Sequence, residues 1–327
     1  MNLIARHFAH PRQSMAHRPV SVCTAALVML SLTAIHCDSV APADHGAPSS
    51  VKVIFGEAGH GPGQFSYPRA IAVSPVDGRI FAVDKRARVQ RFDPNGKFEV
   101  EWRMPDYDNG KPTGLHVDQD NRLFVADTHY ARVICYDREG GELFRWGSYG
   151  EGPGQFIFPE CIFVDPDGFI YVGEYGGNDR ISKFSPDREY LFSFAGRDSG
   201  EGWTDRPTEI LMDETGVLWV ADSCNHRISR FTRDGKYLSS FKLGGDDPAT
   251  LFYPYGMVME KSGNLVIADR GTSRLFRVNR EGKVLGTWGG PGRNPGQLLQ
   301  PWGVGMDRDG RIYCLDSWNN RIQVIEW

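Results

Sequence analysis

The chain has 327 residues, of which 40% are hydrophobic and 24% are charged, a balance typical of globular proteins rather than disordered chains or polytopic membrane proteins. Its 41 Asp and Glu residues outnumber 37 Lys and Arg residues, which argues against a nucleic-acid-binding protein because phosphate contacts need basic side chains. The 38 Gly and 20 Pro residues favour tight turns between short strands, so the composition predicts an all-β protein.

Residues 1–37 are predicted to be an export signal. Three arginines precede the uncharged apolar run 22–35, whose 14 residues are fewer than the roughly 20 that a membrane-spanning helix needs. Cys37 follows this run and resembles the lipid-modified cysteine of bacterial lipoproteins, although His36 stands where such sites carry a small residue. Lipidation at Cys37 and cleavage at a later small residue therefore stay open. Residues 38–50 are rich in Pro, Ser and Ala and are expected to form a flexible tether. We expect an exported protein that is periplasmic, extracellular or lipid-anchored.

Four cysteines lie beyond the signal, at Cys135, Cys161, Cys224 and Cys314. They include no CxxC pair, and no Cys/His cluster has the spacing of a zinc finger or a RING domain. An exported chain could join them in two disulfides. Three of the four lie in apolar, strand-like runs, which favours buried free thiols.

The body of the chain, residues 51–327, repeats one unit six times with a period near 47 residues. An acid ends the second apolar run of each unit, at Asp84, Asp127, Glu174, Asp222, Asp269 and Asp316. A proline opens each unit, at Pro68, Pro112, Pro159, Pro207, Pro254 and Pro301. These two unrelated markers define the same six units. A period of 40 to 50 residues with several strands per unit is typical of a β-propeller.

Each unit divides into four strand-like runs separated by turns. In the fourth unit the runs are 209–213, 217–222, 226–232 and 236–241. Asp-Gly, Asn-Gly and related pairs recur in the turns, where glycine supplies the positive φ of tight hairpins. The second runs are apolar on both faces, as expected for strands packed between neighbouring sheets. The sequence therefore predicts a six-bladed β-propeller with four-stranded blades.

The sixth unit reaches Trp327 after only three strand-like runs. The segment 51–56 (VKVIFG) matches the missing fourth run, as comparison with 143–147 (LFRWG) shows. We therefore predict that this N-terminal strand completes the last blade and closes the ring. Deleting residues 51–56 is expected to open it.

Glycine-rich phrases lead into several of the units, and they carry a family resemblance. The most specific segments are GHGPGQFSYP (59–68), GEGPGQFIFP (150–159), NPGQLLQP (294–301), VADSCNHRISRF (220–231) and CLDSWNNRIQVI (314–325). Together they resemble NHL repeats, a family of six-bladed propellers, over residues 51–327. The second, fourth and fifth units lack the GPGQF phrase, and Glu174 replaces aspartate in the third. The resemblance implies a propeller without fixing its activity, because this scaffold carries binding modules, ligase-associated domains and enzymes.

An acid and an arginine recur together in every unit. The arginines that accompany the six acids are Arg88, Arg132, Arg180, Arg227, Arg274 and Arg321. A catalytic group is needed once, whereas a bond that joins blades is needed in each blade. We therefore interpret these twelve residues as structural.

Positions that break the repeat near the central channel are the candidate ligand-binding residues. The residue after each opening proline varies between Arg69, Thr113, Glu160, Thr208, Tyr255 and Trp302. The loops after the strand-end acids add Lys85, Arg86, His129, Tyr130, Tyr175, Arg270 and Trp318. Arginine forks bind anions and aromatic rings stack, so this set predicts a polar ligand site. Our strongest candidates are Arg69, Glu160, Tyr255, Trp302, His129 and Arg270.

The nearest enzymatic pattern is that of the peptidyl-hydroxyglycine amidating lyases, which hold zinc through three histidines placed directly after opening prolines. None of the six corresponding positions here is histidine. The segment 268–275 (ADRGTSRL) resembles the lyase segment with a catalytic arginine, which maps to Arg270, and Tyr175 lies in a loop comparable to that of the lyase's catalytic tyrosine. A calcium-dependent lactonase would need converging carboxylates, for which Glu160, Glu174 and Glu209 are candidates. No GxSxG elbow is present.

The sequence therefore favours an exported propeller that acts as a binding scaffold for a protein, a peptide or another ligand. The alternative is a metal-dependent lyase or lactonase. No cofactor is expected for the scaffold, whereas the alternative would require zinc or calcium. No nucleic-acid partner is expected, and a membrane contact only through a lipid on Cys37. If the channel mouth is the site, replacing Glu160 and Arg69 by alanine is expected to weaken binding without lowering stability.

Overall fold

The computed structural model describes residues 51–243 and 250–327. Within them the chain forms 24 β-strands and three short 3-10 helices, Thr128–Tyr130, Gly200–Gly202 and Ser317–Asn319. No helix in these two ranges has the length and hydropathy needed to cross a membrane. The predicted export signal, the predicted tether and Cys37 lie outside the described residues.

The strands form six antiparallel sheets of four strands, each corresponding to one blade. Blade 1 contains β2 (Pro68–Val73), β3 (Ile80–Asp84), β4 (Arg88–Phe92) and β5 (Phe98–Arg103), and blade 2 contains β6 (Gly114–Val117), β7 (Leu123–Asp127), β8 (Arg132–Tyr136) and β9 (Glu142–Trp146). Blade 3 contains β10 (Phe158–Val164), β11 (Ile170–Tyr175), β12 (Arg180–Phe184) and β13 (Tyr190–Phe194), and blade 4 contains β14 (Pro207–Met212), β15 (Leu218–Asp222), β16 (Arg227–Phe231) and β17 (Tyr237–Phe241). Blade 5 contains β18 (Pro254–Met259), β19 (Leu265–Asp269), β20 (Arg274–Val278) and β21 (Val284–Gly289), and blade 6 contains β22 (Gly303–Met306), β23 (Ile312–Asp316), β24 (Arg321–Ile325) and β1 (Val51–Phe55).

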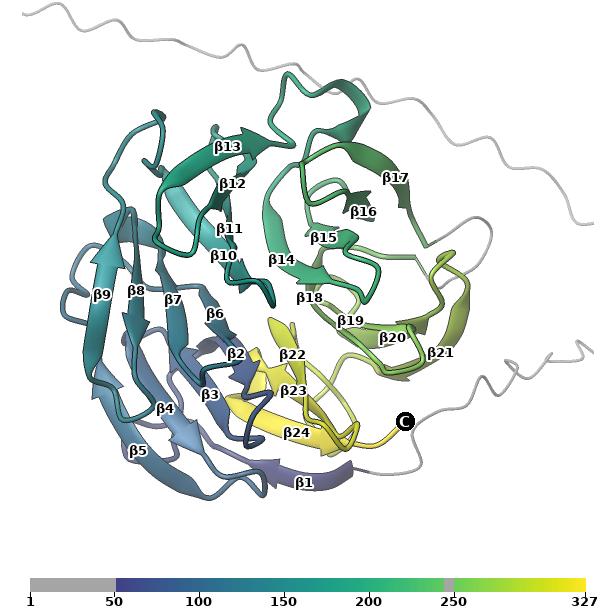
Figure 1. Cartoon of the computed structure of the whole chain (residues 1–327). Coiled ribbons are helices and arrows are strands. Elements are labelled where there is room, and N and C mark those ends of the chain that lie inside the picture. Colours follow the sequence, from purple (N-terminus) through teal and green to yellow (C-terminus); the bar gives the residue numbers. More distant parts are fainter. Residues whose placement is uncertain (1–50, 244–249) are drawn as a thin grey trace, which may run out of the picture. The chain divides into compact units, whose positions relative to one another are not determined.

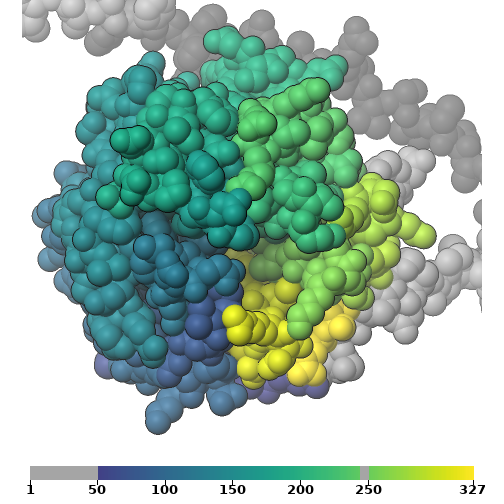
Figure 2. Space-filling model, in the orientation of Figure 1, coloured from purple at the N-terminus to yellow at the C-terminus, as the bar shows by residue number. Residues whose placement is uncertain are grey.

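The six blades stand around a central channel (Figure 1). The first strand of each blade is innermost, and each inner strand contacts the inner strands of the two neighbouring blades. The space-filling view shows the blades closed around a narrow central hollow (Figure 2). The predicted six-bladed propeller is confirmed.

Strand β1 supplies the outer strand of blade 6, so the ring closes as the sequence predicts. It pairs antiparallel with β24, with Val51 opposite Ile325 and Phe55 opposite Ile322. The ring of Phe55 also lies 5.1 Å from that of Phe92 in blade 1. Gly96, at φ +85° in the turn between β4 and β5, leaves room for Phe55, because a Cβ on Gly96 would come within 2.3 Å of that ring.

The hydrophobic core lies between neighbouring blades. All five residues of β3, β7, β15, β19 and β23 are buried, as predicted for strands that are apolar on both faces. Between blades 1 and 2, for example, Phe81 and Val83 of β3 belong to the same buried cluster as Leu123 and Val125 of β7. Burial of whole strands on both faces gives each blade a continuous apolar contact with the next, and this stabilises the ring.

Two glycines permit the inner strands to approach closely around the channel. A Cβ on Gly114 of β6 would lie 2.4 Å from the carbonyl oxygen of Glu160, and one on Gly256 of β18 would lie 2.8 Å from the Cα of Gly303. Any larger side chain at these positions would push neighbouring backbones apart. The width of the channel therefore depends on residues that carry no side chain.

The four cysteines of the body are free, in agreement with the predicted thiols. Cys135, Cys161 and Cys314 are buried, whereas Cys224 is partly exposed. Burial raises the pKa of the Cys135 thiol to about 12, so this thiol stays protonated at neutral pH.

Candidate ligand-binding mouth of the channel

A bulge near the start of the inner strand aims candidate residues at one end of the channel. The register between the first and second strands shifts after Pro68, Pro159, Pro207 and Pro254, in blades 1, 3, 4 and 5. The residues that fall in the shift are Arg69, Glu160, Thr208 and Tyr255. A bulged residue is released from the regular alternation of a strand and can be re-aimed. The variable position after each proline thus has a structural cause.

The structure gathers six residues at this end of the channel, which we call the channel mouth: Arg69, Glu160, Arg206, Tyr255, Arg270 and Trp302. At its centre Glu160 is 1% exposed. Arg206 donates a hydrogen bond from Nη2 to Glu160 Oε1 at 3.0 Å, and the hydroxyl of Tyr255 donates to the same oxygen at 3.1 Å. One carboxylate therefore joins blades 3, 4 and 5.

The other half of the channel mouth is built around Trp302. Its ring lies 4.8 Å from that of Tyr255, and the guanidinium carbons of Arg69 and Arg270 each lie 5.3 Å from its ring centre. Arg270 also donates a hydrogen bond to the side chain of Gln300 at 3.1 Å. Cation–π contact of this kind holds arginine side chains in place while leaving donor nitrogens for a ligand.

The channel mouth contains buried polar atoms that have no hydrogen-bond partner among the described residues. They are Nε of Arg69, Arg206 and Arg270, Nε1 of Trp302, and Oε2 of Glu160. Leaving such atoms unpaired costs about 1–3 kcal/mol each, more when the group is charged. Three guanidinium groups also face a single carboxylate, so the charges that meet here do not cancel. The channel mouth therefore combines unpaired donor atoms with an excess of positive charge.

Burial and charge shift the pKa values of three groups at or beside the channel mouth. Burial and the charge of Glu160 raise the pKa of Tyr255 well above its usual value, and the same two causes raise that of Tyr175. Burial alone would lower the pKa of Arg206, but the charge and hydrogen bond of Glu160 together with the two tyrosines outweigh it and raise that pKa. Both phenols stay protonated at neutral pH, and that of Tyr255 donates to Glu160.

A surface groove adjoins the channel mouth between blades 6 and 1. It encloses about 730 Å³, and its lining includes His60, Tyr67, Lys85 and Trp318. Tyr67 links the two regions, because its ring lies 5.6 Å from that of Trp302 and 5.9 Å from that of Trp318. Trp318 is 50% exposed and donates a hydrogen bond from Nε1 to the hydroxyl of Tyr67 at 2.7 Å. The groove therefore offers exposed aromatic surface beside the arginines.

The remaining predicted positions lie around this centre. Tyr175 stacks on Phe158 at 5.3 Å, and the guanidinium carbon of Arg206 lies 4.5 Å from the Tyr175 ring. His129 is exposed and reaches the channel mouth only through Phe158, whose ring lies 5.6 Å away. Thr113 and Thr208 bond to neighbouring groups, Thr128 and the carbonyl of Pro254 respectively. Of the six strongest candidates, the structure brings five together and leaves His129 at the periphery.

Arg206 is the member of the channel mouth that sequence reasoning missed. It precedes an opening proline, where other units carry Tyr67, Phe158, Tyr253 and Gln300, and its φ is +58°. The same left-handed backbone recurs at Tyr67, Tyr253 and Gln300, and it turns each side chain away from the direction that a strand would give. One signal in the sequence could have identified Arg206. Among the residues that precede the six opening prolines, only Arg206 and Lys111 are cations.

The recurring acids end the second strands and the arginines begin the third strands, and in blades 1, 3, 4 and 5 the acid lies opposite the proline that precedes the bulge. Five pairs are ion pairs: Asp84–Arg88 at 3.0 Å, Asp127–Arg132 at 2.8 Å, Glu174–Arg180 at 2.6 Å, Asp222–Arg227 at 2.7 Å and Asp316–Arg321 at 2.8 Å. Within the described residues no ion pair joins Asp269 to Arg274; Asp269 accepts hydrogen bonds from the Phe252 amide and the Thr272 hydroxyl instead.

These pairs also hold the loop that arrives from the preceding blade. Asp316 accepts a hydrogen bond from the Leu299 amide at 2.7 Å, and Arg321 donates to the carbonyl oxygen of Gln297 at 3.0 Å. Glu174 and Arg180 contact Ile157 and Gln155 in the same way. Such repetition around the ring supports a structural role rather than a catalytic one.

The residues at the channel mouth do not fit a divalent-cation site. In the part of the chain that the structure describes, no three His, Cys, Asp or Glu residues group closely enough to hold a metal ion. Glu160 already accepts two hydrogen bonds, and Glu174 is paired with Arg180. Three guanidinium groups would also repel a cation placed beside Glu160.

Comparison with known proteins agrees with this architecture. The family model described as NHL repeat matches residues 204–231 and 298–325, which lie in blades 4 and 6. The chain thus carries NHL repeats in two of its six blades. It is 24% identical over 175 residues to peptidyl-glycine alpha-amidating monooxygenase A of Xenopus laevis, a match that covers 49% of this chain and 18% of the relative. It is also 24% identical over 180 residues to human NHL repeat-containing protein 3, covering 47% and 49% of the two chains.

Among solved structures, this six-bladed propeller is similar to a gluconolactonase from Xanthomonas campestris, with a TM-score of 0.63 and 16% identity over 81% of this chain and 87% of the other. At that identity the likeness shows the fold alone. The chain spans less than half the length of the curated relatives named above, so their whole activities do not transfer by similarity.

Proposed function

We propose that this NHL propeller is a binding scaffold whose channel mouth receives a carboxylate presented by a peptide or protein partner. The observation that supports it is the set of buried, unpaired Nε atoms on Arg69, Arg206 and Arg270 around one end of the channel. A planar carboxylate matches the fork of donors on a guanidinium group and would supply acceptors for these atoms.

The adjoining groove favours a peptide over a small inorganic anion. The groove continues from the channel mouth past Tyr67 to the half-exposed Trp318. An isolated anion would fill only the channel mouth, whereas a peptide would also occupy the groove. Aromatic side chains are enriched in surfaces that bind proteins. If the C-terminal carboxylate of a peptide lies in the channel mouth, the residues before it would contact the rings of Tyr67 and Trp318. If the predicted export signal operates, this recognition takes place outside the cytoplasm.

The test is a comparison of two hexapeptide libraries that differ only at the C-terminus, one with a free carboxylate and one amidated, binding being followed by tryptophan fluorescence. We expect the free-carboxylate library to bind at least about tenfold more tightly, a difference of about 1.4 kcal/mol. Arg69→Gln and Arg270→Gln should each lose about tenfold in affinity. Equal binding of both libraries, or binding unchanged by either variant, would overturn the proposal.

The matched control is Arg308→Gln, which removes the same charge from an exposed arginine in the turn between β22 and β23. It should bind as the wild type does. Alanine at Glu160 is a poorer probe than the sequence suggests, because Glu160 is buried and holds Arg206 and Tyr255. Its removal would change the folded structure as well as the site.

The enzyme alternative rests on two residues. Tyr175 and Arg270 are the positions matched to catalytic residues of the amidating lyase. The guanidinium group of Arg270 lies over the ring of Tyr255, and that of Arg206 lies over the rings of both Tyr255 and Tyr175. Measurement of metal content in protein purified without chelators decides between the two functions. One equivalent of tightly held zinc or calcium would favour a lyase or lactonase, and metal-free protein that binds carboxylate peptides would favour the scaffold.

A further inference from the structure

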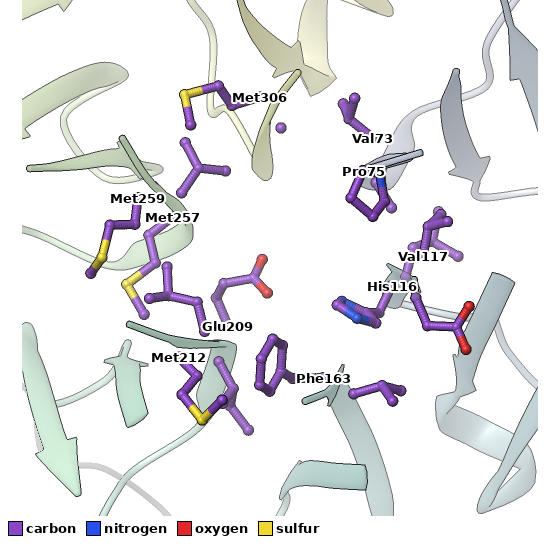
Figure 3. Close-up of a pocket in the computed structure, with 18 of the residues that line it drawn as sticks. Val73, Pro75, His116, Val117, Phe163, Glu209, Met212, Met257, Met259 and Met306 are labelled. Atoms are coloured by element: carbon purple, nitrogen blue, oxygen red, sulfur yellow. The ribbon is translucent and has the colours of Figure 1, made fainter. Parts of the chain in front are cut away.

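The opposite end of the channel holds a second cavity that the proposed peptide site does not use. It encloses about 430 Å³ and is lined by the far ends of the inner strands. Four of the chain's eight methionines line it, Met212, Met257, Met259 and Met306. We call it the methionine chamber. Figure 3 shows the Glu209 side chain projecting into it beside these methionines, with His116 on the opposite side of the cavity.

A constriction separates the methionine chamber from the channel mouth. The space there is only about 20 Å³ and is lined by Thr208, Tyr255 and Trp302 among others. Tyr255 and Trp302 also belong to the channel mouth, so their rings form its floor. A ligand in one cavity therefore does not occupy the other.

The methionine chamber holds one carboxyl group that has no counter-ion within residues 51–243 and 250–327. Among the described residues that line it, none is a lysine or an arginine. Asp118 is satisfied by Arg122, which lies 2.7 Å from it. Glu209 has no side-chain partner in the described part of the chain, and its carboxyl accepts a hydrogen bond only from the backbone of Ile210.

The methionine chamber without a ligand is electrically neutral near pH 7. Burial raises the pKa of Glu209 to about 8 and lowers that of His116 to about 4. The thiol of Cys161, on the adjacent strand β10, also has a pKa raised well above its usual value by burial and by the charge of Glu209. His116 therefore does not act as the counter-ion of Glu209, and a cation from outside would be the first.

We propose that the methionine chamber binds a small lipophilic cation, an organic ammonium ion whose charge pairs with Glu209 and whose apolar body lies against the methionines and Phe163. The charge complementarity is specific, because the lining offers one unpaired carboxylate and no cation. Thioether side chains are flexible and polarizable and adapt to apolar ligands of irregular shape. The ring of Phe163, packed edge-on against His116 at 5.2 Å, adds a face that attracts cations.

The probe is benzyltrimethylammonium, titrated calorimetrically into the full chain, with benzylsulfonate as an anion of similar size and body. The cation should bind and the sulfonate should not. Because the cation favours the ionised carboxyl, affinity should rise about tenfold between pH 6 and pH 7, below the pKa of about 8, and level off above it. Titration in buffers of different ionisation enthalpy should show release of close to one proton at pH 6.

Glu209→Gln should lower the affinity at least about tenfold at pH 8, and abolish both the proton release and its pH dependence. Glu281→Gln, at an exposed turn residue, is the matched control and should bind as the wild type does. Arg270→Gln should also leave binding of the cation intact, which separates this site from the proposed peptide site. Equal binding of cation and sulfonate, or unchanged proton release in a folded Glu209→Gln protein, would overturn the proposal.

Discussion

At the scale of single residues, the fifth blade departs from the other five. The acid that ends the second strand is ion-paired with an arginine in every other blade, whereas Asp269 relies on the Phe252 amide and the Thr272 hydroxyl. Burial raises the pKa of Asp269 to about 7, although these hydrogen bonds lower it. The acid at the end of the second strand therefore has a different electrostatic environment in blade 5 than in the other five blades.

This difference predicts a pH dependence of stability. In the unfolded chain an aspartate has a pKa of about 4, so between pH 4 and 7 the folded state retains a proton on Asp269 that the unfolded state releases. The free energy of unfolding contributed by Asp269 thus falls as pH rises through that window. Asp269→Asn removes the titration and should gain about 2 kcal/mol relative to the wild type between pH 5 and pH 8, measured by urea unfolding.

Asp316→Asn is the comparison, since Asp316 is held by Arg321 at 2.8 Å. Removing its charge leaves a largely buried arginine unpaired, so this variant should lose stability at both pH values. A stability difference between Asp269→Asn and the wild type that is the same at pH 5 and pH 8 would contradict the interpretation of Asp269.

At the scale of elements, the sequence predicted strands and turns well because each has a local physical signature. Doubly apolar runs such as 218–222 have no place except between two sheets, and the glycine pairs mark the hairpins. The variable position after each proline also located most of the channel mouth. Arg206 was missed because the position before the proline is not one of the two variable positions from which the candidates were taken. Glu209 was named only as a candidate calcium ligand, because the sequence does not show that its carboxyl lacks a side-chain partner among the described residues.

The close spacing of the inner strands could not be predicted from the sequence either. It predicts the effect of a substitution at Gly114. Gly114→Ala places a methyl group 2.4 Å from the backbone oxygen of Glu160, and backbone cannot give way as the tip of a side chain can. We expect a loss of about 2–3 kcal/mol in the free energy of unfolding, measured by denaturant titration.

Gly196→Ala is the matched control for this prediction. Its added Cβ would meet the nearest atoms, the Cβ of Arg180 and the carbonyl oxygen of Asp179, at 3.9 Å, an ordinary contact. It should be neutral or slightly stabilising, because alanine has fewer unfolded conformations than glycine. Equal stability of the two alanine variants would mean that the inner strands can separate without cost.

At the scale of the whole molecule, the channel is polarised from end to end. Three arginines and one carboxylate meet at the channel mouth, and a single unpaired carboxyl faces the methionine chamber. The inner strands contribute to both ends: β2, β10 and β18 carry mouth residues near their starts, and the far ends of the inner strands line the chamber. The two proposed sites therefore share one mechanical support, the closed ring.

Closure of that ring predicts the largest single loss of stability. Deleting residues 51–56 removes β1, exposes the edge of β24 and leaves Phe92 without the ring of Phe55. An open edge strand is also prone to pair with other chains. If the loss is about 5 kcal/mol, the melting temperature should fall by about 10–20 °C, and circular dichroism would measure it. A synthetic peptide with the sequence of residues 51–56 should restore part of the loss by occupying the vacant edge. Unchanged melting after the deletion would show that blade 6 is stable with three strands.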